Sequence, residues 1–275
     1  MINGQVVLLL AVCGLAGCSR ADHGELSSAA AVDKQASRDD TAPPQQAGSQ
    51  PRPIAVPPAT DSDTARGNIA PARAVGGGIY EAKLGELRIS IRAPGCQPLM
   101  PSLLECRQGA SVEVQVPPAG GMAAIRVEAL DLNPLAAVYR GPLDGSYRKD
   151  GISIIVADVD LDGDEDVSVL TGRRGAYGSP SYTVFLRDQA GTAFVQSKPF
   201  SDLTVDHLGM FTMEAGKIRA FTKSGCCVHI DETYALDNDR PKLVEVVTRT
   251  SASAGAPEKV EVKRIIDGQL RVVQQ

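Results

Sequence analysis

Apolar and polar residues alternate with a period of two through most of the chain after Gly77, and this pattern constrains the fold more than any other feature. Such alternation is typical of strands with one buried and one exposed face. One continuous apolar run, Gly151–Val159, instead predicts a central strand buried on both faces. The alternating segments are Leu87–Arg92, Ser111–Val116, Ala124–Leu130, Asp166–Leu170, Tyr182–Leu186, Lys242–Val247, Lys259–Ile265 and Leu270–Gln274.

Turn-forming dipeptides separate these segments, and no long helical period accompanies them. We therefore predict one all-β domain over residues 77–275, built of short antiparallel strands in a sandwich or a propeller-like arrangement. No repeat is regular enough to count propeller blades. The turn dipeptides are Asn133-Pro134, Asp144-Gly145, Asp150-Gly151, Ala215-Gly216 and Asp267-Gly268.

The first 17 residues have the character of a secretion signal. Val6–Cys18 is an apolar run of 13 residues, and a bilayer-spanning helix needs about 20. The run ends in LAGC, which resembles the lipobox of bacterial lipoproteins, whose cysteine is acylated and becomes the first mature residue. We expect lipidation at Cys18. Because Ser19 is not aspartate, the resemblance implies an outer-membrane lipoprotein facing the periplasm.

Residues 18–76 follow as the lipidated cysteine and a tether rich in Pro, Ala and Ser. They carry no hydrophobic periodicity, and such a composition predicts a disordered spacer. The net charge of −5 comes from 33 acids and 28 bases. No run of five or more Lys or Arg occurs, which argues against nucleic acid as a partner.

Six acids lie within the nine residues Asp158–Asp166, and they account for the acidic excess of the chain. The pattern D-x-D-x-D-G-x-x-D places carboxylates where they converge on one point, and Gly163 permits the sharp turn. Position 12 is Val169 rather than the glutamate of an EF-hand. We expect one Ca²⁺ loop between two strands, since calcium takes six to eight oxygen ligands. Its candidate ligands are Asp158, Asp160, Asp162, Asp164 and Asp166.

Four cysteines remain in the predicted domain, and an oxidising periplasm favours disulfides. Cys96 and Cys106 flank a short Pro-containing loop and are expected to pair. Cys226 and Cys227 are then left as a vicinal disulfide or as thiols, and a crossed pairing stays open.

The segment Gly172–Tyr182 is rich in Gly and Ser and follows the acidic loop and its strand. The order of acidic loop, strand, Gly-rich loop and YTVFL resembles FG-GAP and VCBS-like periplasmic lipoproteins, as does the later SGCCVHIDETY. That group includes an immunity lipoprotein that inhibits a lysozyme-like type IV secretion effector. The resemblance covers about residues 152–247.

The resemblance implies a protein that inhibits a peptidoglycan-cleaving, lysozyme-like enzyme, with calcium shaping the binding loop. Lysozyme-type enzymes carry paired carboxylates in a cleft, and the loop offers residues to meet them. We expect Tyr177 and Ser179 to contact the catalytic carboxylates of that enzyme, with Gly178 between them. Tyr182 starts the next strand and is expected to frame the loop. The alternative is a cell-envelope calcium-binding lipoprotein that binds glycan or protein without inhibiting. An enzyme is not expected, because no G-x-S-x-G, H-E-x-x-H or phosphate-loop motif occurs.

Overall fold

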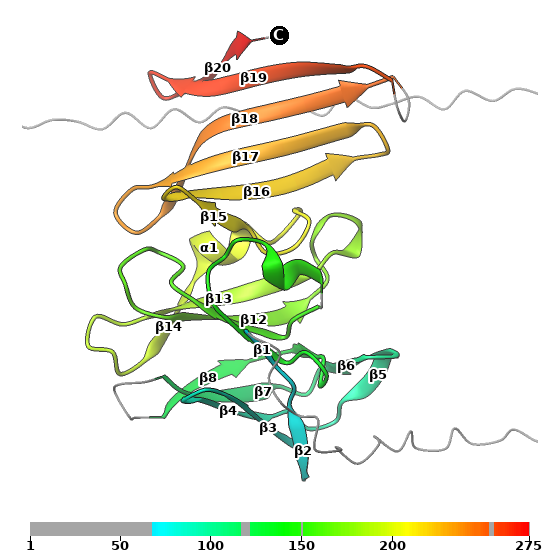
Figure 1. Ribbon diagram of the computed structural model, residues 1–275, viewed down its shortest axis with the longest axis vertical. Coiled ribbons are helices and arrows are strands. Elements are labelled where there is room, and N and C mark those ends of the chain that lie inside the picture. The colour runs from blue at the N-terminus through cyan, green and yellow to red at the C-terminus, as the bar shows by residue number, and fades with distance from the viewer. Residues whose placement is uncertain (1–67, 117–121, 150, 253–255, 275) are drawn as a thin grey trace, which may run out of the picture. The chain divides into compact units, whose positions relative to one another are not determined.

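The computed structural model describes residues 68–116, 122–149, 151–252 and 256–274. The expected signal segment, Cys18 and most of the tether lie outside the described residues. Within them the chain is all-β, as predicted, with twenty strands in four sheets (Figure 1). The only α-helix in the described part is α1 (Lys198–Asp202).

The strands of each sheet lie side by side in chain order, but in three of the four sheets one neighbouring pair is not consecutive in the chain. The central sheet runs β1 (Ile69–Ala70), β10 (Val138–Arg140), β11 (Ile154–Ala157), β12 (Asp166–Gly172), β13 (Ser181–Arg187), β14 (Phe194–Ser197). The C-terminal sheet runs β15 (Thr212–Glu214), β16 (Lys217–Ser224), β17 (Val228–Leu236), β18 (Pro241–Ser251), β19 (Glu258–Ile266), β20 (Gln269–Gln274). The five-stranded sheet runs β2 (Arg73–Gly76), β3 (Ile79–Leu84), β4 (Leu87–Arg92), β7 (Ala110–Gln115), β8 (Ala123–Val127). The three-stranded sheet runs β5 (Gln97–Met100), β6 (Leu103–Cys106), β9 (Leu130–Leu132).

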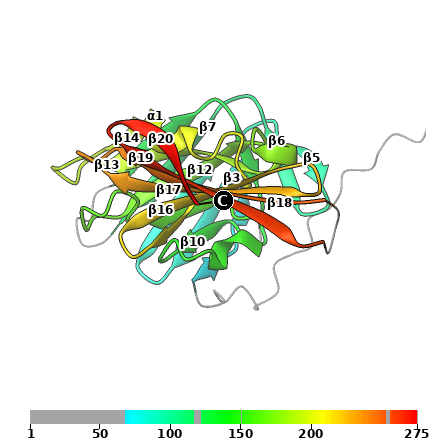
Figure 2. The same cartoon turned by 90° about the horizontal axis from the view of Figure 1, so that it is seen from above.

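Almost all neighbouring strands are antiparallel, and β10 with β11 is the parallel exception. The C-terminal sheet is a simple meander in which each strand pairs with the next along the chain. Figure 2 views the same strands from above, with the C-terminus towards the reader.

The central sheet is buried on both faces, which explains the continuous apolar run of β11. Ile154 and Val156 pack with the five-stranded sheet in one core cluster. Ile155 and Ala157 belong to a second cluster, together with α1 and the first strands of the C-terminal sheet. Because successive strand residues point to opposite faces, a strand between two cores needs apolar residues at every position.

Two boundaries differ from the sequence prediction. Strands begin at Ile69, before the expected domain start at residue 77, and Ala70 is buried in the core. Strands of two and four residues are too short to show a period. The segment Ala124–Leu130, predicted as one strand, is two, because β8 pairs with β7 while β9 pairs with β6 in another sheet.

The cysteines form two disulfides. Cys96 is bonded to Cys106, as predicted. Cys226 is bonded to Cys227, so the vicinal pairing is the one adopted among the alternatives left open by the sequence.

Candidate functional site

The acidic loop connects β11 to β12, which are antiparallel neighbours. It brings together one carboxylate oxygen each from Asp158, Asp160 and Asp166, all within 4.8 Å of one another. Asp160 and Asp166 are buried, and Asp158 is partly buried. Three of the five expected ligands therefore converge: Asp158 directly follows β11, Asp166 begins β12, and Asp160 lies in the loop between them.

Burial raises the pKa of these carboxyl groups. The pKa of Asp166 rises to about 7, although its carboxylate accepts backbone N–H groups from Arg187 and Val159, both at 2.8 Å. Burial likewise raises the pKa of Asp160 to about 6, and neighbouring aspartates add to the shift. Such groups are stabilised in their charged form by a nearby cation.

The hydrogen bonding of Asp158 bears on whether the cluster fits a cation. Asp158 Oδ1 has no hydrogen-bond partner among the described residues, whereas Oδ2 accepts the Gly163 N–H at 3.1 Å. An unpartnered buried carboxylate oxygen is costly. The donor set, all oxygen and all acidic, is the kind that Ca²⁺ prefers. The three carboxylates thus fit a calcium ion.

The other two expected ligands lie in the turn itself. Asp162 and Asp164 are exposed and stand outside the three-residue group. Asp162 Oδ1 accepts the Asp164 N–H at 2.8 Å, so this carboxylate supports the turn. Glu165 closes the loop through a bidentate pair with Arg140 on β10, at 2.6 and 2.8 Å.

The Gly-rich segment lies at the opposite end of β12 from the acidic loop. It leaves β12 after Gly172 and returns as β13 at Ser181, and we call residues 173–180 the tyrosine loop. A seven-residue strand is about 23 Å long at roughly 3.3 Å per residue. The two loops are therefore separate places on the molecule.

Tyr177 is at the tip of the tyrosine loop, and its side chain is 65% exposed. Its backbone is left-handed, with φ of 57°, a conformation that residues other than glycine seldom adopt. The following residue, Gly178, is exposed and also left-handed. Strained tips of this kind persist only where surrounding contacts hold them.

Those contacts come from the turn between β16 and β17. The Gly225 N–H donates to the Tyr177 hydroxyl, which in turn donates to the Gly225 carbonyl at 3.4 Å. The Lys223 ammonium lies over the tyrosine ring, 4.9 Å from its centroid. An exposed aromatic side chain is thus held in one position from two directions.

The base of the tyrosine loop is held by the segment that follows α1. The Ala176 N–H donates to the His207 carbonyl at 2.8 Å, and the Asp206 N–H donates to the Arg174 carbonyl at 3.0 Å. Gly175 lies against the same carbonyl, since a Cβ there would be 2.5 Å from His207 O. Only glycine fits this close approach.

The other two expected contact residues, Ser179 and Tyr182, have different environments. The Ser179 hydroxyl donates to the Ala176 carbonyl at 2.7 Å, so it closes the loop internally. Tyr182 is 4% exposed and donates to the Ile152 carbonyl at 2.9 Å. Its burial keeps it from direct contact with a partner and agrees with the framing position expected from the sequence.

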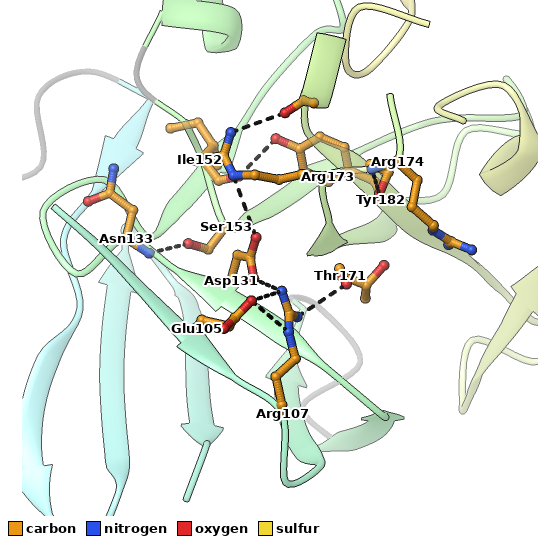
Figure 3. Close-up of polar contacts among 12 residues, drawn as sticks. Glu105, Arg107, Asp131, Asn133, Ile152, Ser153, Thr171, Arg173, Arg174 and Tyr182 are labelled. Atoms are coloured by element: carbon orange, nitrogen blue, oxygen red, sulfur yellow. Dashed lines mark hydrogen bonds and ion pairs between the residues drawn. The ribbon is translucent and has the colours of Figure 1, made fainter. Parts of the chain in front are cut away.

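A buried carboxylate that carries no sequence motif supports the loop from below (Figure 3). Asp131 on β9 is fully buried, with Arg107 Nη2 at 2.8 Å on one side and Arg173 Nε at 3.9 Å on the other. Burial raises its pKa, against the opposing effect of the two arginines. Arg173 also donates to the Gly178 carbonyl at 3.4 Å, so it links the three-stranded sheet to the loop tip.

His207 ties this region to the C-terminal sheet. Its Nε2 is 3.0 Å from Glu232 on β17, and Nδ1 is 2.9 Å from the Val205 carbonyl. Burial lowers the histidine pKa, but the hydrogen bonds and the glutamate charge outweigh it, so the pKa is raised. The hydrogen bond from His207 holds the pKa of Glu232 below its usual range.

These features define a class of protein: an all-β fold with an oxygen-rich acidic cluster and an exposed tyrosine that is held rigidly. The chain is similar to a solved structure of a Xanthomonas Type IV Secretion System related protein, with 33% sequence identity and a TM-score of 0.70. The match covers 76% of this chain and 99% of that one. The chain therefore belongs to the same family as that protein. No protein-family model matches the chain, and no curated protein does.

Sequence reasoning identified both loops but missed their supports. Asp131, Arg173, Lys223 and His207 carry no local motif, and they meet only because strands distant in sequence are adjacent. The signal in the sequence was the isolated buried-strand aspartate in ALDLN, an acid at a position where β9 is apolar on both sides. Among the described residues, no helix is long and apolar enough to span a membrane.

Proposed function

We propose that this protein is a secretion-system-associated lipoprotein that binds and inhibits a lysozyme-like peptidoglycan hydrolase, without catalysis of its own. The observation that carries the proposal is Tyr177, a 65% exposed aromatic residue held at the tip of a braced loop. Tyrosine is enriched among the residues that dominate binding energy at interfaces. A preorganised side chain loses little entropy on binding.

The loop has the chemistry to meet a glycosidase cleft. Enzymes of this class use two carboxyl groups on either side of the scissile bond. A tyrosine hydroxyl can donate to a carboxylate, while its ring covers apolar surface in the cleft. The family relationship to a type IV secretion system related protein supports this direction, since the sequence resembles lipoproteins that include an inhibitor of a type IV secretion effector.

Calcium has a supporting part in the proposal. Asp158, Asp160 and Asp166 would hold the ion, which would neutralise buried carboxylates and fix the β11–β12 hairpin. The tyrosine loop has its direct supports elsewhere, from the His207 segment and the Gly225 turn. Calcium would therefore shape the binding loop only through β12.

The test is an inhibition assay with purified lysozymes of several classes and with lysozyme-like domains encoded beside this gene. The full-length protein, in Ca²⁺, should inhibit at least one of them at stoichiometric amounts. Tyr177→Ala should lose that inhibition while melting at the same temperature. Full hydrolase activity at excess protein across the panel would reject the inhibitor and leave the envelope-binding alternative.

The proposed location rests on Cys18, which would anchor the protein in the outer membrane facing the periplasm. Mass spectrometry of membrane-extracted protein should find an acylated N-terminal Cys18, and Cys18→Ala should release the protein into the soluble fraction. An unmodified Met1 would contradict the anchor.

A further inference from the structure

The end of β16 and the turn that leads to β17, residues 223–227, are a second exposed element beside Tyr177. Lys223, Ser224, Gly225 and Cys226 are all exposed. The Cys226–Cys227 disulfide closes the turn, and Gly225 presents its N–H to the Tyr177 hydroxyl. Two segments far apart in sequence thus meet at one surface, which we call the tyrosine–lysine surface.

Lys223 is the notable charge of this surface. Its ammonium lies 4.9 Å from the Tyr177 ring centroid, and no carboxylate within the described part of the chain forms an ion pair with it. Most other cations of the C-terminal sheet are paired, among them Arg219 with Glu214 and Arg264 with Glu245. Among the cations of this sheet that form no ion pair within the described residues, Lys223 is the one stacked on an aromatic ring. An unpaired ammonium stacked on an exposed aromatic ring can bind an anionic group of a partner molecule.

We infer that Lys223 contacts the partner directly, as the cation that pairs with a carboxylate of the hydrolase cleft next to the group that Tyr177 meets. This inference rests on the proposed function and adds its second contact residue. Because the ammonium lies over the ring, the two side chains present a hydroxyl donor and a positive charge as one unit. A cleft with two carboxylates matches that pair of donors.

The experiment compares charge changes at two ends of one strand. Lys223→Gln, Lys223→Glu and Lys223→Arg are measured for binding kinetics and inhibition against the panel hydrolase that the wild-type protein inhibits most strongly. Lys217→Glu is the matched control, because Lys217 is also exposed, at the other end of β16. Thermal melting verifies that each variant is folded.

Lys223→Gln should weaken binding about tenfold, Lys223→Glu more, and Lys223→Arg should stay near wild type, because the contact depends on charge. Lys217→Glu should remain within about twofold, as expected for a charge outside the contact surface. Changing the cleft carboxylates of the hydrolase to amides should remove the difference between wild type and Lys223→Gln, which is the signature of a pairwise contact.

Three results would overturn the inference, and they can be told apart. If the wild-type protein inhibits and both Lys223→Gln and Lys223→Glu inhibit as well as wild type, Lys223 makes no contact with the hydrolase. The proposed function would then hold without this inference. A Lys223→Gln change that weakens binding to the same extent when the cleft carries amides also excludes the carboxylate contact. If wild-type protein inhibits no hydrolase, the proposed function fails and this inference falls with it.

Discussion

The two ends of β12 carry features that are opposite in character. At its start, Asp158, Asp160 and Asp166 form a buried cluster with raised pKa values and an oxygen that lacks a partner. At its far end, Tyr177 is exposed, and its polar atom has partners within the fold. The first region has a buried oxygen without a hydrogen-bond partner, whereas in the second the polar atom is satisfied within the fold and the side chain is exposed.

We expect the acidic cluster to affect stability and the tyrosine loop to affect recognition of a partner. A ligand that satisfies buried groups stabilises the folded state by mass action. A preorganised exposed side chain adds little to stability and much to binding. Changes at the two ends of β12 should therefore move different measurements, and four predictions test this.

Removing Ca²⁺ with a chelator should have the largest effect of the four changes, and the effect should be a loss of stability. At a Ca²⁺ concentration 100 times the dissociation constant, binding adds about 2.7 kcal/mol, which is roughly 5–11 °C in melting temperature for a domain of this size. Asp166→Asn should abolish this calcium-dependent shift, because Asp166 is the most buried of the three carboxylates. Asp164→Asn, exposed and outside the group, should keep most of it. Equal melting curves in Ca²⁺ and chelator would remove the calcium site.

Tyr177→Ala should have the largest effect on inhibition. A loss of about 30-fold corresponds to roughly 2 kcal/mol, the scale of a binding hot spot. Ser179→Ala is the comparison, since its hydroxyl is engaged with Ala176 O, and it should cost less. Inhibition that survives both changes would move the contact site elsewhere while leaving the function open.

Gly175→Ala should displace the loop from beneath. The added Cβ would lie 2.5 Å from the His207 carbonyl and 2.8 Å from the Ser179 carbonyl, and backbone atoms cannot yield easily. We expect about tenfold weaker inhibition and a loss near 1–3 kcal/mol in stability. Gly172→Ala is the control, because its Cβ would make only an ordinary 3.6 Å contact with Ser181 Oγ. Equal behaviour of both variants would show that the His207 contact does not shape the loop.

The smallest effect should be a pH dependence from His207 and Glu232. The raised pKa of His207 means that its contribution is present below its unfolded value and is lost as pH rises through the folded pKa. The lowered pKa of Glu232 means that its contribution is present above its unfolded value and is lost as pH falls through the folded pKa. The pair should contribute most between about pH 4.5 and 6.5.

Melting of wild type and His207→Gln at pH 5.5 and pH 8.5 measures this contribution. The difference between the two proteins should be larger at pH 5.5. A difference that grows at pH 8.5 would contradict the pairing of His207 with Glu232.

Local patterns predicted most of the fold and located the acidic loop and the tyrosine loop in the chain. The strand alternation located β4, β7, β12, β13 and β18–β20 because each strand has one consistent environment along its length. The acidic loop was visible because its carboxylates lie within nine residues. The Cys96–Cys106 disulfide followed from the short loop between its cysteines.

The supports of the tyrosine loop were not predictable in the same way. Lys223 and Gly225 reach Tyr177 across 46 and 48 positions of the chain, and Asp131 reaches Arg173 across 42. No spacing rule connects such residues, since strand order decides which of them meet.

The most direct test of the separation compares Asp166→Asn and Tyr177→Ala with wild type for hydrolase inhibition at a temperature where all three are folded. We predict that Asp166→Asn inhibits nearly as well as wild type despite its lost calcium response, whereas Tyr177→Ala inhibits about 30-fold more weakly. If folded Asp166→Asn loses inhibition as completely as Tyr177→Ala, the acidic loop takes part in recognition and the two ends of β12 do not have separate roles.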